Sequence, residues 1–246
     1  MKIRVIACCL NEEEMLPHFL DYYGHYVDEI VIYDGGSTDY SHEIIRAFPK
    51  AKLIIDKHEK MDERKLTGIR NEAYKADRYK WDWQIVVDVD EFLYHPMFRA
   101  TLADYKLNFV SLPKIVGYDM YSKEFPPFVA DKNIFDFVKK GRRNDQWQNK
   151  RVVFDPRSVD INYGLGCHTC SPTGYVKESD NADLKLLHFN YVGYQHFIKR
   201  HRFNAERMSV FNKEHNLAYH IPMFAKMTED EFNKKVDDEA KDIILY

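Results

Sequence analysis

The stretch IVVDVDEFLY at residues 85–94 joins an apolar run to three acidic residues, Asp88, Asp90 and Glu91. The apolar run has the length and composition of a buried strand. Acidic side chains at the end of a buried strand repel one another and lose hydration. We therefore expect a compensating group at this point, and a metal ion, a basic cluster or water could each supply it.

Three similar apolar runs precede this stretch and alternate with helical patterns. We expect helices after Asn11, which has capping-box spacing to Glu14, and at residues 37–48 and 62–78. Strands that alternate with helices predict βαβ units and a mainly parallel sheet. Ligands bind beyond the carboxyl ends of such strands. The three strands are expected at residues 3–10 (IRVIACCL), 27–34 (VDEIVIYD) and 51–56 (AKLIID).

The pattern becomes looser after residue 100. One long helix is expected at residues 193–215, and a last helix begins at Thr228, which has capping-box spacing to Glu231. No internal repeat or linker-like composition is visible, so we expect one domain over residues 1–246. Further strands are expected within residues 108–121, 150–155 and 184–192.

Composition limits the class of protein. The chain has 36 basic and 39 acidic residues and a formal net charge of −3, which argues against a dedicated nucleic-acid binder. The N-terminal apolar stretch is short and runs into acidic residues, so we expect no signal peptide and a cytoplasmic protein. Cys167 and Cys170 have C-x-x-C spacing, but no further pair of ligands lies nearby, and buried thiols are favoured over a zinc site.

Four segments together resemble family 2 glycosyltransferases of the GT-A fold. ACCLNEEEMLPHFLDYY, VDEIVIYDGGSTD, GIRNEAYKAD and IVVDVDEF occur in the order and at about the spacing of that family, over residues 3–94. The resemblance implies an α/β, Rossmann-like GT-A domain with a mainly parallel sheet flanked by helices and a helical C-terminal tail. Its nucleotide-sugar-binding half would be residues 1–100, its acceptor-side half residues 101–192 and its C-terminal helices residues 193–246.

The resemblance also implies an activity. It predicts a hexosyltransferase-type enzyme that moves a sugar from a nucleotide-sugar donor, UDP-linked, to a hydroxyl of a glycan or glycoconjugate, with Mn²⁺ or Mg²⁺ and with inversion. Two alternatives stay open, a sugar-phosphate nucleotidyltransferase and a non-catalytic carbohydrate-binding protein. The acidic, glycine-free turn CLNEEEM disfavours the first of these.

In this family the end of the first strand and the aspartate of the second hold the nucleotide base. The matching residues are Ala7, Cys8, Asn11 and Asp34. Asp34 can accept a hydrogen bond from the N–H of a uracil-type ring. The usual family pattern has a second acidic residue next, where this chain has Gly35. The alternative is that Asp34 only starts an Asx-type turn with the glycines.

Arg70 matches the arginine of the family's Arg-Asn pair. A guanidinium there would meet the donor's diphosphate or the acidic rim, and Lys65 on the same predicted helix is a second candidate for contact with the donor. The alternative for both residues is a solvated helix face.

The triplet Asp88-Val89-Asp90 matches the DxD element of the family. In an extended chain its two carboxylates point the same way and can share a hard divalent cation that also binds the donor's phosphates. The resemblance therefore makes Asp88 and Val89 donor contacts and Asp88 and Asp90 metal ligands. His188 would complete the metal shell, although a hydrogen-bonded core histidine is an equal alternative. Glu91 points elsewhere and is expected either to be structural or to support the residues that bind the ligands.

Asp119 and His168 are the candidates for the catalytic base, because an inverting transferase needs a group that takes the proton of the acceptor hydroxyl. Asp119 follows a predicted strand among aromatic residues and is preferred. The basic segment from Lys139 to Arg151 is a lid over the diphosphate, a contact for an anionic acceptor or a solvated loop. The cluster at residues 199–203 leaves a peripheral contact with anionic lipid headgroups open, against an exposed helix face.

Overall fold

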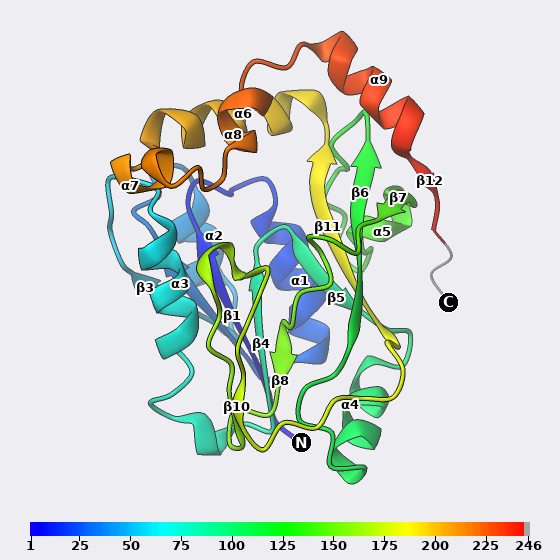
Figure 1. Cartoon of the computed structure of the whole chain (residues 1–246). Coiled ribbons are helices and arrows are strands. Elements are labelled where there is room, and N and C mark those ends of the chain that lie inside the picture. Colours follow the sequence, from blue (N-terminus) through cyan, green and yellow to red (C-terminus); the bar gives the residue numbers. More distant parts are fainter. Residues whose placement is uncertain (244–246) are drawn as a thin grey trace.

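The structure is a computed structural model that describes residues 1–243. Its first sheet has the order β3-β2-β1-β4-β8. The first four strands of the chain run parallel and β8 is antiparallel to β4. This arrangement confirms the predicted α/β architecture with a mainly parallel sheet (Figure 1). The strands are β1 (Ile3–Cys9), β2 (Glu29–Asp34), β3 (Ala51–Ile55), β4 (Trp83–Asp88) and β8 (Val153–Phe154).

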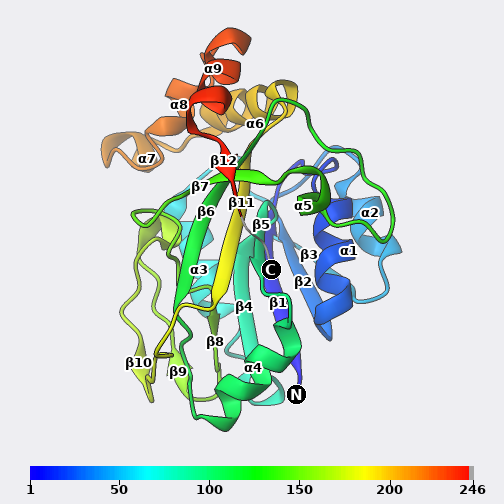
Figure 2. The same ribbon diagram turned by 90° about the vertical axis from the view of Figure 1, so that its right-hand side faces the viewer.

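Helices cover both faces of this sheet. Figure 2 shows α1 (Leu16–Tyr26) and α2 (Ser41–Ala47) on one face and α3 (Glu63–Glu72) on the other. Alternating strand residues supply the two apolar layers, since successive side chains of a strand point to opposite faces. Val5 and Ile32 belong to one buried cluster, and Ile6 and Val31 to the other.

A second sheet has the order β12-β7-β6-β11-β5. Within it, β11 lies between β6 and β5, and it is parallel to β6 and antiparallel to β5. Because β5 follows β4 closely in the chain, the two sheets meet at the acidic stretch. The strands are β5 (Glu91–Tyr94), β6 (Ile115–Ser122), β7 (Lys140–Arg143), β11 (Leu184–Val192) and β12 (Lys241–Asp242).

Three helices, α6 (Tyr194–Arg207), α7 (Val210–Glu214) and α8 (His220–Phe224), lie above the carboxyl ends of the parallel strands (Figure 1). They place C-terminal side chains over the rim where ligands bind in such sheets. The predicted helical C-terminal region is thus confirmed. It ends with α9 (Glu229–Glu239), whose capping box of Thr228 and Glu231 was also predicted correctly.

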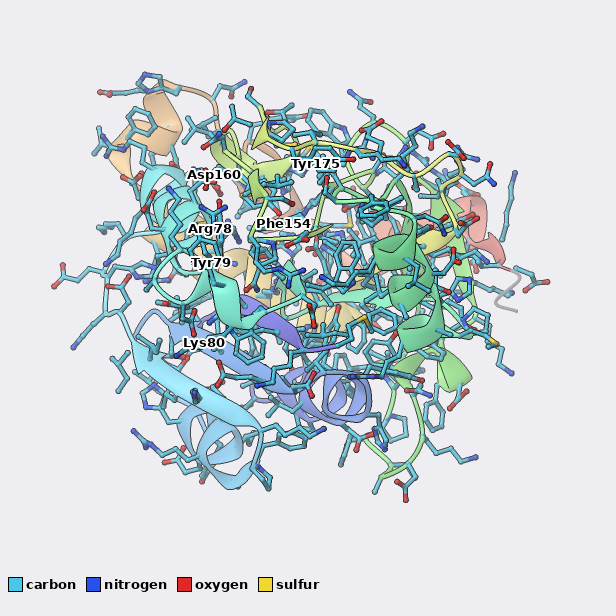
Figure 3. The ribbon with its side chains drawn as sticks, turned by 90° about the horizontal axis from the view of Figure 1, so that it is seen from below. Arg78, Tyr79, Lys80, Phe154, Asp160 and Tyr175 are labelled. Atoms are coloured by element: carbon cyan, nitrogen blue, oxygen red, sulfur yellow. The ribbon has the colours of Figure 1, made fainter. Side chains whose placement is uncertain are left out.

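The opposite end of the molecule holds short connecting elements. Figure 3 shows Arg78, in the 3-10 helix η1 (Arg78–Lys80), beside Asp160 of β9 (Val159–Asp160). Arg78 Nη1 lies 2.7 Å from Asp160 Oδ1 and fastens η1 to β9. The elements of residues 1–243 that remain to be named, not all at this end, are α4 (Phe98–Leu107), α5 (Ile134–Phe137), the 3-10 helix η2 (Leu165–Cys167) and β10 (Thr173–Gly174). Among residues 1–243, no helix combines the length and the hydrophobicity needed to cross a membrane.

Two helix predictions were wrong. Asn11 does not cap α1, which begins five residues later; its backbone has a φ of 54° and its side chain accepts a hydrogen bond from Thr38 N–H at 2.8 Å. The single helix expected at residues 193–215 is divided into α6 and α7, because Ser209 accepts a hydrogen bond from Asn212 N–H and starts a new helix there.

Candidate active site

The acidic stretch bends where an extended strand was expected. β4 ends at Asp88, Val89 and Asp90 form a turn, and β5 starts at Glu91. The prediction of an extended Asp88-Val89-Asp90 triplet was therefore wrong. The side chain of Asp88 is 33% exposed, whereas that of Asp90 is 1% exposed, so the two carboxylates have different surroundings. Val89 is buried in the main apolar cluster.

Asp88 is paired with Arg70, which α3 holds in a buried position. Burial by itself raises the pKa of Asp88, but the attraction of Arg70 and Lys150 outweighs burial and holds the pKa below its ordinary value. The carboxylate is therefore ionised at neutral pH. Arg70 also lies 3.7 Å from the sulfur of Cys167, and burial raises the pKa of the neighbouring Cys8 thiol to about 11.

Asp90 is held by residues from the second half of the chain. Its Oδ2 pairs with Arg200 of α6 and lies 3.2 Å from His188 Nε2. Burial raises the pKa of Asp90, but Arg200 and His188 together bring it well below its ordinary value. Its Oδ1 is buried and has no hydrogen-bond partner among the described residues. An unpaired buried carboxylate oxygen is costly, and it is free to take a ligand.

His188 bridges two carboxylates. Its Nε2 faces Asp90 and its Nδ1 lies 3.4 Å from Asp119 Oδ1. Burial lowers the pKa of His188, but the two carboxylates outweigh burial and raise it to about 10. The ring is then a cation at neutral pH, whereas a metal-bound imidazole nitrogen must be unprotonated. In residues 1–243, no three His, Cys, Asp or Glu side chains are grouped so that they could hold a metal ion, and Asp88, Asp90 and His188 do not form such a set.

Of the two candidates for the base, Asp119 is already fully engaged. It lies on β6, accepts hydrogen bonds from Asn144 Nδ2 at 2.7 Å and Gln148 Nε2 at 3.2 Å, and contacts His188. Burial raises the pKa of Asp119, but these hydrogen bonds, above all that from His188, lower it below its ordinary value. A carboxylate held in this way is a weak proton acceptor.

His168 has a freer nitrogen. Its Nδ1 lies 2.8 Å from the carbonyl oxygen of Trp147, so Nδ1 carries the hydrogen and Nε2 has its lone pair available. Burial lowers the pKa of His168, and Lys150 lowers it further. The ring is therefore neutral at pH 7 and able to accept a proton.

Asp34 is completely buried within its own turn. Its Oδ1 accepts hydrogen bonds from Gly36 N–H at 2.8 Å and Ser37 N–H at 2.7 Å, and it lies 2.7 Å from His42 Nε2. This is the Asx-type turn that the sequence left as an alternative. A contact between Asp34 and a nucleotide base stays a prediction, and in this geometry it requires a change in the turn.

The position next to Asp34 is closed to a second acidic side chain. A Cβ atom on Gly35 would lie 2.7 Å from Cε1 of His58, so the imidazole occupies the space beside the backbone. Lys65 contacts the loop that carries His58, and its Nζ lies 3.0 Å from Asp56 Oδ1. Lys65 therefore points toward the loop after β3 and pairs there. Ala7 is buried, and Asn11 links the loops after β1 and β2.

Comparison with known families identifies the chain. The family model described as "Glycosyl transferase family 2" matches residues 4–159, well over half of the sequence. This chain belongs to glycosyl transferase family 2. No curated protein sequence matches this glycosyltransferase.

Solved structures resemble the glycosyltransferase at low identity. The crystal structure of S. aureus TarS is 13% identical over 84% of this chain and 39% of its own, with a TM-score of 0.47. S. aureus TarS 1-349 in complex with UDP is 13% identical over 96% of this chain and 72% of its own, with a TM-score of 0.46. Glucosyl-3-phosphoglycerate synthase from Mycobacterium tuberculosis, in complex with Mn²⁺, UDP and glucosyl-3-phosphoglycerate, is 22% identical over 47% of this chain and 44% of its own, with a TM-score of 0.33. The chain thus spans well under half of the full TarS chain.

The site has two cations that sequence patterns did not single out, one of them buried and the other half-buried. Lys150, expected in a lid or a loop, is 6% exposed and pairs with Glu91. Glu91 Oε2 in turn accepts a hydrogen bond from Asp88 N–H at 3.0 Å, which confirms its predicted structural role. Arg200, expected in an exposed cluster, reaches both Asp90 and Glu12. No local pattern reveals either pairing, because the partners are far apart in the chain.

The four cysteines are free thiols. Cys9 and Cys167 are buried, and Cys8 and Cys170 are half-buried. Of the two thiols that were expected to be buried in the C-x-x-C segment, only that of Cys167 is fully so.

Proposed function

We propose that this family 2 glycosyltransferase moves a sugar from a UDP-linked donor to a hydroxyl group of a glycan or glycoconjugate, with inversion and with Mn²⁺ or Mg²⁺. The observation that carries the proposal is the turn at residues 88–91, where two ionised carboxylates lie beside three cations, two of them buried and one, Arg200, half-buried. Such a site can hold a divalent cation on its acids and a diphosphate on its cations. The three cations are Arg70, Lys150 and Arg200.

The unpaired oxygen of Asp90 supports a metal ion at this turn. Asp90 Oδ1 is buried without a partner in the described residues, and carboxylate oxygen is the ligand that Mg²⁺ and Mn²⁺ prefer. Asp90 Oδ1 would be the protein ligand of the ion, and a bound ion would offset negative charge on the departing diphosphate. His188 could become a ligand through Nε2 only after losing its proton. As it stands, His188 orients Asp90.

Donor binding would then use both halves of the chain. Arg70 would meet the diphosphate from α3, and the loops at Ala7–Asn11 and Asp34–Gly36 would meet the nucleoside at the same rim. The geometry favours His168 over Asp119 as the base, because His168 keeps Nε2 free and neutral. In an inverting displacement, His168 Nε2 would accept the proton of the acceptor hydroxyl as that oxygen attacks the sugar's anomeric carbon.

Donor hydrolysis and donor binding test the proposal. Purified protein is incubated with a panel of nucleotide sugars, with Mn²⁺ or with EDTA, and nucleotide release is measured. We expect release of UDP that depends on the metal and falls at least tenfold in Asp90→Asn. If the wild-type protein neither binds nor hydrolyses any UDP-sugar, and Asp90→Asn changes nothing, the proposal is wrong.

A further inference from the structure

Trp147 is an exposed tryptophan in the loop that follows β7. Its side chain is 43% exposed, whereas the other two tryptophans of the chain, Trp81 and Trp83, are buried. The indole N–H of Trp147 has no hydrogen-bond partner among residues 1–243, while Trp83 Nε1 donates to the carbonyl oxygen of Leu102 at 3.1 Å. A single exposed aromatic side chain is ordinary in a folded protein, so its surroundings decide whether it has a role.

The loop that carries Trp147 is fixed to β6 on both sides of this residue. Asn144 N–H donates to the carbonyl oxygen of Gly117 at 2.9 Å, and Gly117 N–H donates to Asn149 Oδ1 at 2.8 Å. A Cβ atom on Gly117 would overlap the carbonyl oxygen of Gln148, so the loop and the strand are in direct contact. Between these anchors, Asn144 Oδ1 accepts a hydrogen bond from Trp147 N–H at 3.1 Å. The indole is therefore presented by a loop that is already ordered without a ligand.

Trp147 and His168 form a pair between two loops. His168 Nδ1 donates to the carbonyl oxygen of Trp147 at 2.8 Å, and the two rings meet edge to face with their centroids 5.2 Å apart. The backbone before His168 turns sharply, with left-handed φ values of 75° at Gly166 and 58° at Cys167. A left-handed conformation is unfavourable for cysteine, and strained turns of this kind are concentrated at functional sites. This turn holds His168 beside Trp147.

His168 places this pair near the acidic turn at residues 88–91. Burial lowers the pKa of His168 and Lys150 lowers it further, while Glu91 and Asp88 raise it in part, so the charges of the turn act on the ring. The unoccupied Nε2 of His168 is the atom assigned above to the proton of the acceptor hydroxyl. An acceptor whose hydroxyl meets that atom brings the rest of its sugar ring within reach of the indole of Trp147.

We propose that Trp147 is the surface on which a sugar ring of the acceptor stacks, and that this contact selects which acceptor hydroxyl meets His168. The inference rests on the proposed function, and it concerns the acceptor and not the donor. A pyranose ring has an apolar face of C–H groups that packs on an indole, and hydroxyl groups at its edge that need polar partners. Asp145 and Gln146, next to Trp147 in the loop, are exposed and can supply such partners. A lipid chain or an apolar peptide would need a continuous apolar surface instead.

Tryptophan fluorescence of the full-length protein tests the stacking without a donor. Because Trp81 and Trp83 are buried, acrylamide quenches mainly the emission of Trp147. The protein is titrated with the methyl α- and β-glycosides of glucose, galactose, mannose, N-acetylglucosamine and N-acetylgalactosamine. We expect at least one of these sugars to shift the emission of Trp147 and to lower its quenching by acrylamide.

Transfer kinetics with the sugar that binds then separate the acceptor from the donor. In Trp147→Ala we expect the KM for that sugar to rise about tenfold, because the stacking surface is lost, while the affinity for UDP stays within about twofold. The kcat should change less than the KM, since the backbone carbonyl at position 147 still holds His168. Trp147→Phe keeps an aromatic face and should recover most of the KM. Tyr79→Ala is the matched control, because Tyr79 is an exposed aromatic residue of η1 at the opposite end of the molecule (Figure 3).

Three results would overturn the inference while the proposed function stands. They are a wild-type protein whose Trp147 emission no sugar changes, a Trp147→Ala variant that loses affinity for UDP but keeps its KM for the sugar, and equal KM values in Trp147→Ala and Trp147→Phe. Thermal unfolding verifies the fold of each variant, and if Trp147→Ala does not fold, the fluorescence of the wild type decides. If the wild-type protein neither binds nor hydrolyses any UDP-sugar, the proposed function fails, and the acceptor role of Trp147 fails with it.

Discussion

The two halves of this glycosyltransferase contribute opposite charges to its site. Most of the acids belong to the first hundred residues, where Asp88, Asp90 and Glu91 lie on one short peptide. Most of the cations belong to the rest of the chain. Lys150 pairs across 59 residues with Glu91, and Arg200 pairs across 110 residues with Asp90. The acidic turn is thus compensated by a basic cluster that exists only in the folded protein.

The largest expected effect tests whether the second half also supplies chemistry. His168→Gln should lower kcat about 10²- to 10⁴-fold, because the protein loses its proton acceptor, while UDP affinity stays within twofold. Steady-state kinetics and UDP titration measure the two quantities. His215→Gln, at an exposed histidine beyond α7, is the control and should keep its kcat. A wild-type kcat in His168→Gln would exclude His168 as the base.

Removing an ion pair that joins the two halves of the chain should lower the stability of the protein. Lys150→Met should lower the free energy of unfolding by about 3–5 kcal/mol, because Glu91 is left charged and buried. Glu91→Gln in the same chain should recover part of this loss, since the neutral amide still accepts from Asp88 N–H. Chemical denaturation measures both variants.

An exposed ion pair provides the contrast for Lys150. Lys123 pairs with Asp237 at 2.7 Å, and their side chains are 46% and 62% exposed. Lys123→Met should therefore cost less than about 1 kcal/mol. Equal losses in Lys150→Met and Lys123→Met would contradict the buried role of Lys150.

A contact inside the first half should have a smaller effect. Gly35→Asp should lower the free energy of unfolding by about 1–3 kcal/mol, because the new side chain meets the ring of His58. Gly35→Asp together with His58→Ala should restore stability, since Gly35 has no positive φ that would exclude a side chain. Thermal and chemical unfolding report both variants. If Gly35→Asp alone is as stable as wild type, His58 does not fill that space in solution.

The last expected effect concerns the helices above the rim and depends on pH. Burial, opposed in part by the bond between His201 Nδ1 and the Phe197 carbonyl oxygen, lowers the pKa of His201 to about 3. The unfolded chain binds this proton near pH 6.5 and the folded chain does not. Stability is therefore complete above about pH 6.5 and declines as the pH falls toward 3, by at most about 1.4 kcal/mol for each pH unit.

The variant His201→Gln isolates this contribution. Its free energy of unfolding should change less than that of the wild type between pH 7 and pH 5, measured by denaturant titration at each pH. Parallel curves for the two proteins would contradict a neutral buried His201.

Local patterns predicted the first sheet well, since apolar periodicity and βαβ alternation are properties of short segments. They failed at Asn11, because a left-handed backbone conformation leaves no mark on the hydrophobic pattern. They also failed at Ser209, which has a cap-forming side chain inside a continuous helical pattern. Boundaries of this kind depend on one hydrogen bond and not on the segment as a whole.

The acids of the site could be found from sequence, because Asp88 and Asp90 follow an apolar run and their type alone indicates their chemistry. The cations could not. Lys150 was placed in a lid or a loop and Arg200 on an exposed face, since solvated and buried basic residues look the same in a single sequence. Which carboxylate a lysine meets depends on the packing of distant strands and helices.

The place of β11 between β5 and β6 has a consequence for folding during synthesis. The four parallel strands of the first sheet are complete once Asp88 has left the ribosome, but β5 ends at Tyr94 and its partner β11 begins only at Leu184. At about 5–20 residues per second, β5 stays without β11 for roughly five to twenty seconds, and β6, which ends at Ser122, stays without it for a shorter time. During this interval their apolar edges are open to pairing with other chains. The nascent protein is therefore most prone to aggregate after β5 has been synthesised and before β11 has joined it, when the site has not yet formed.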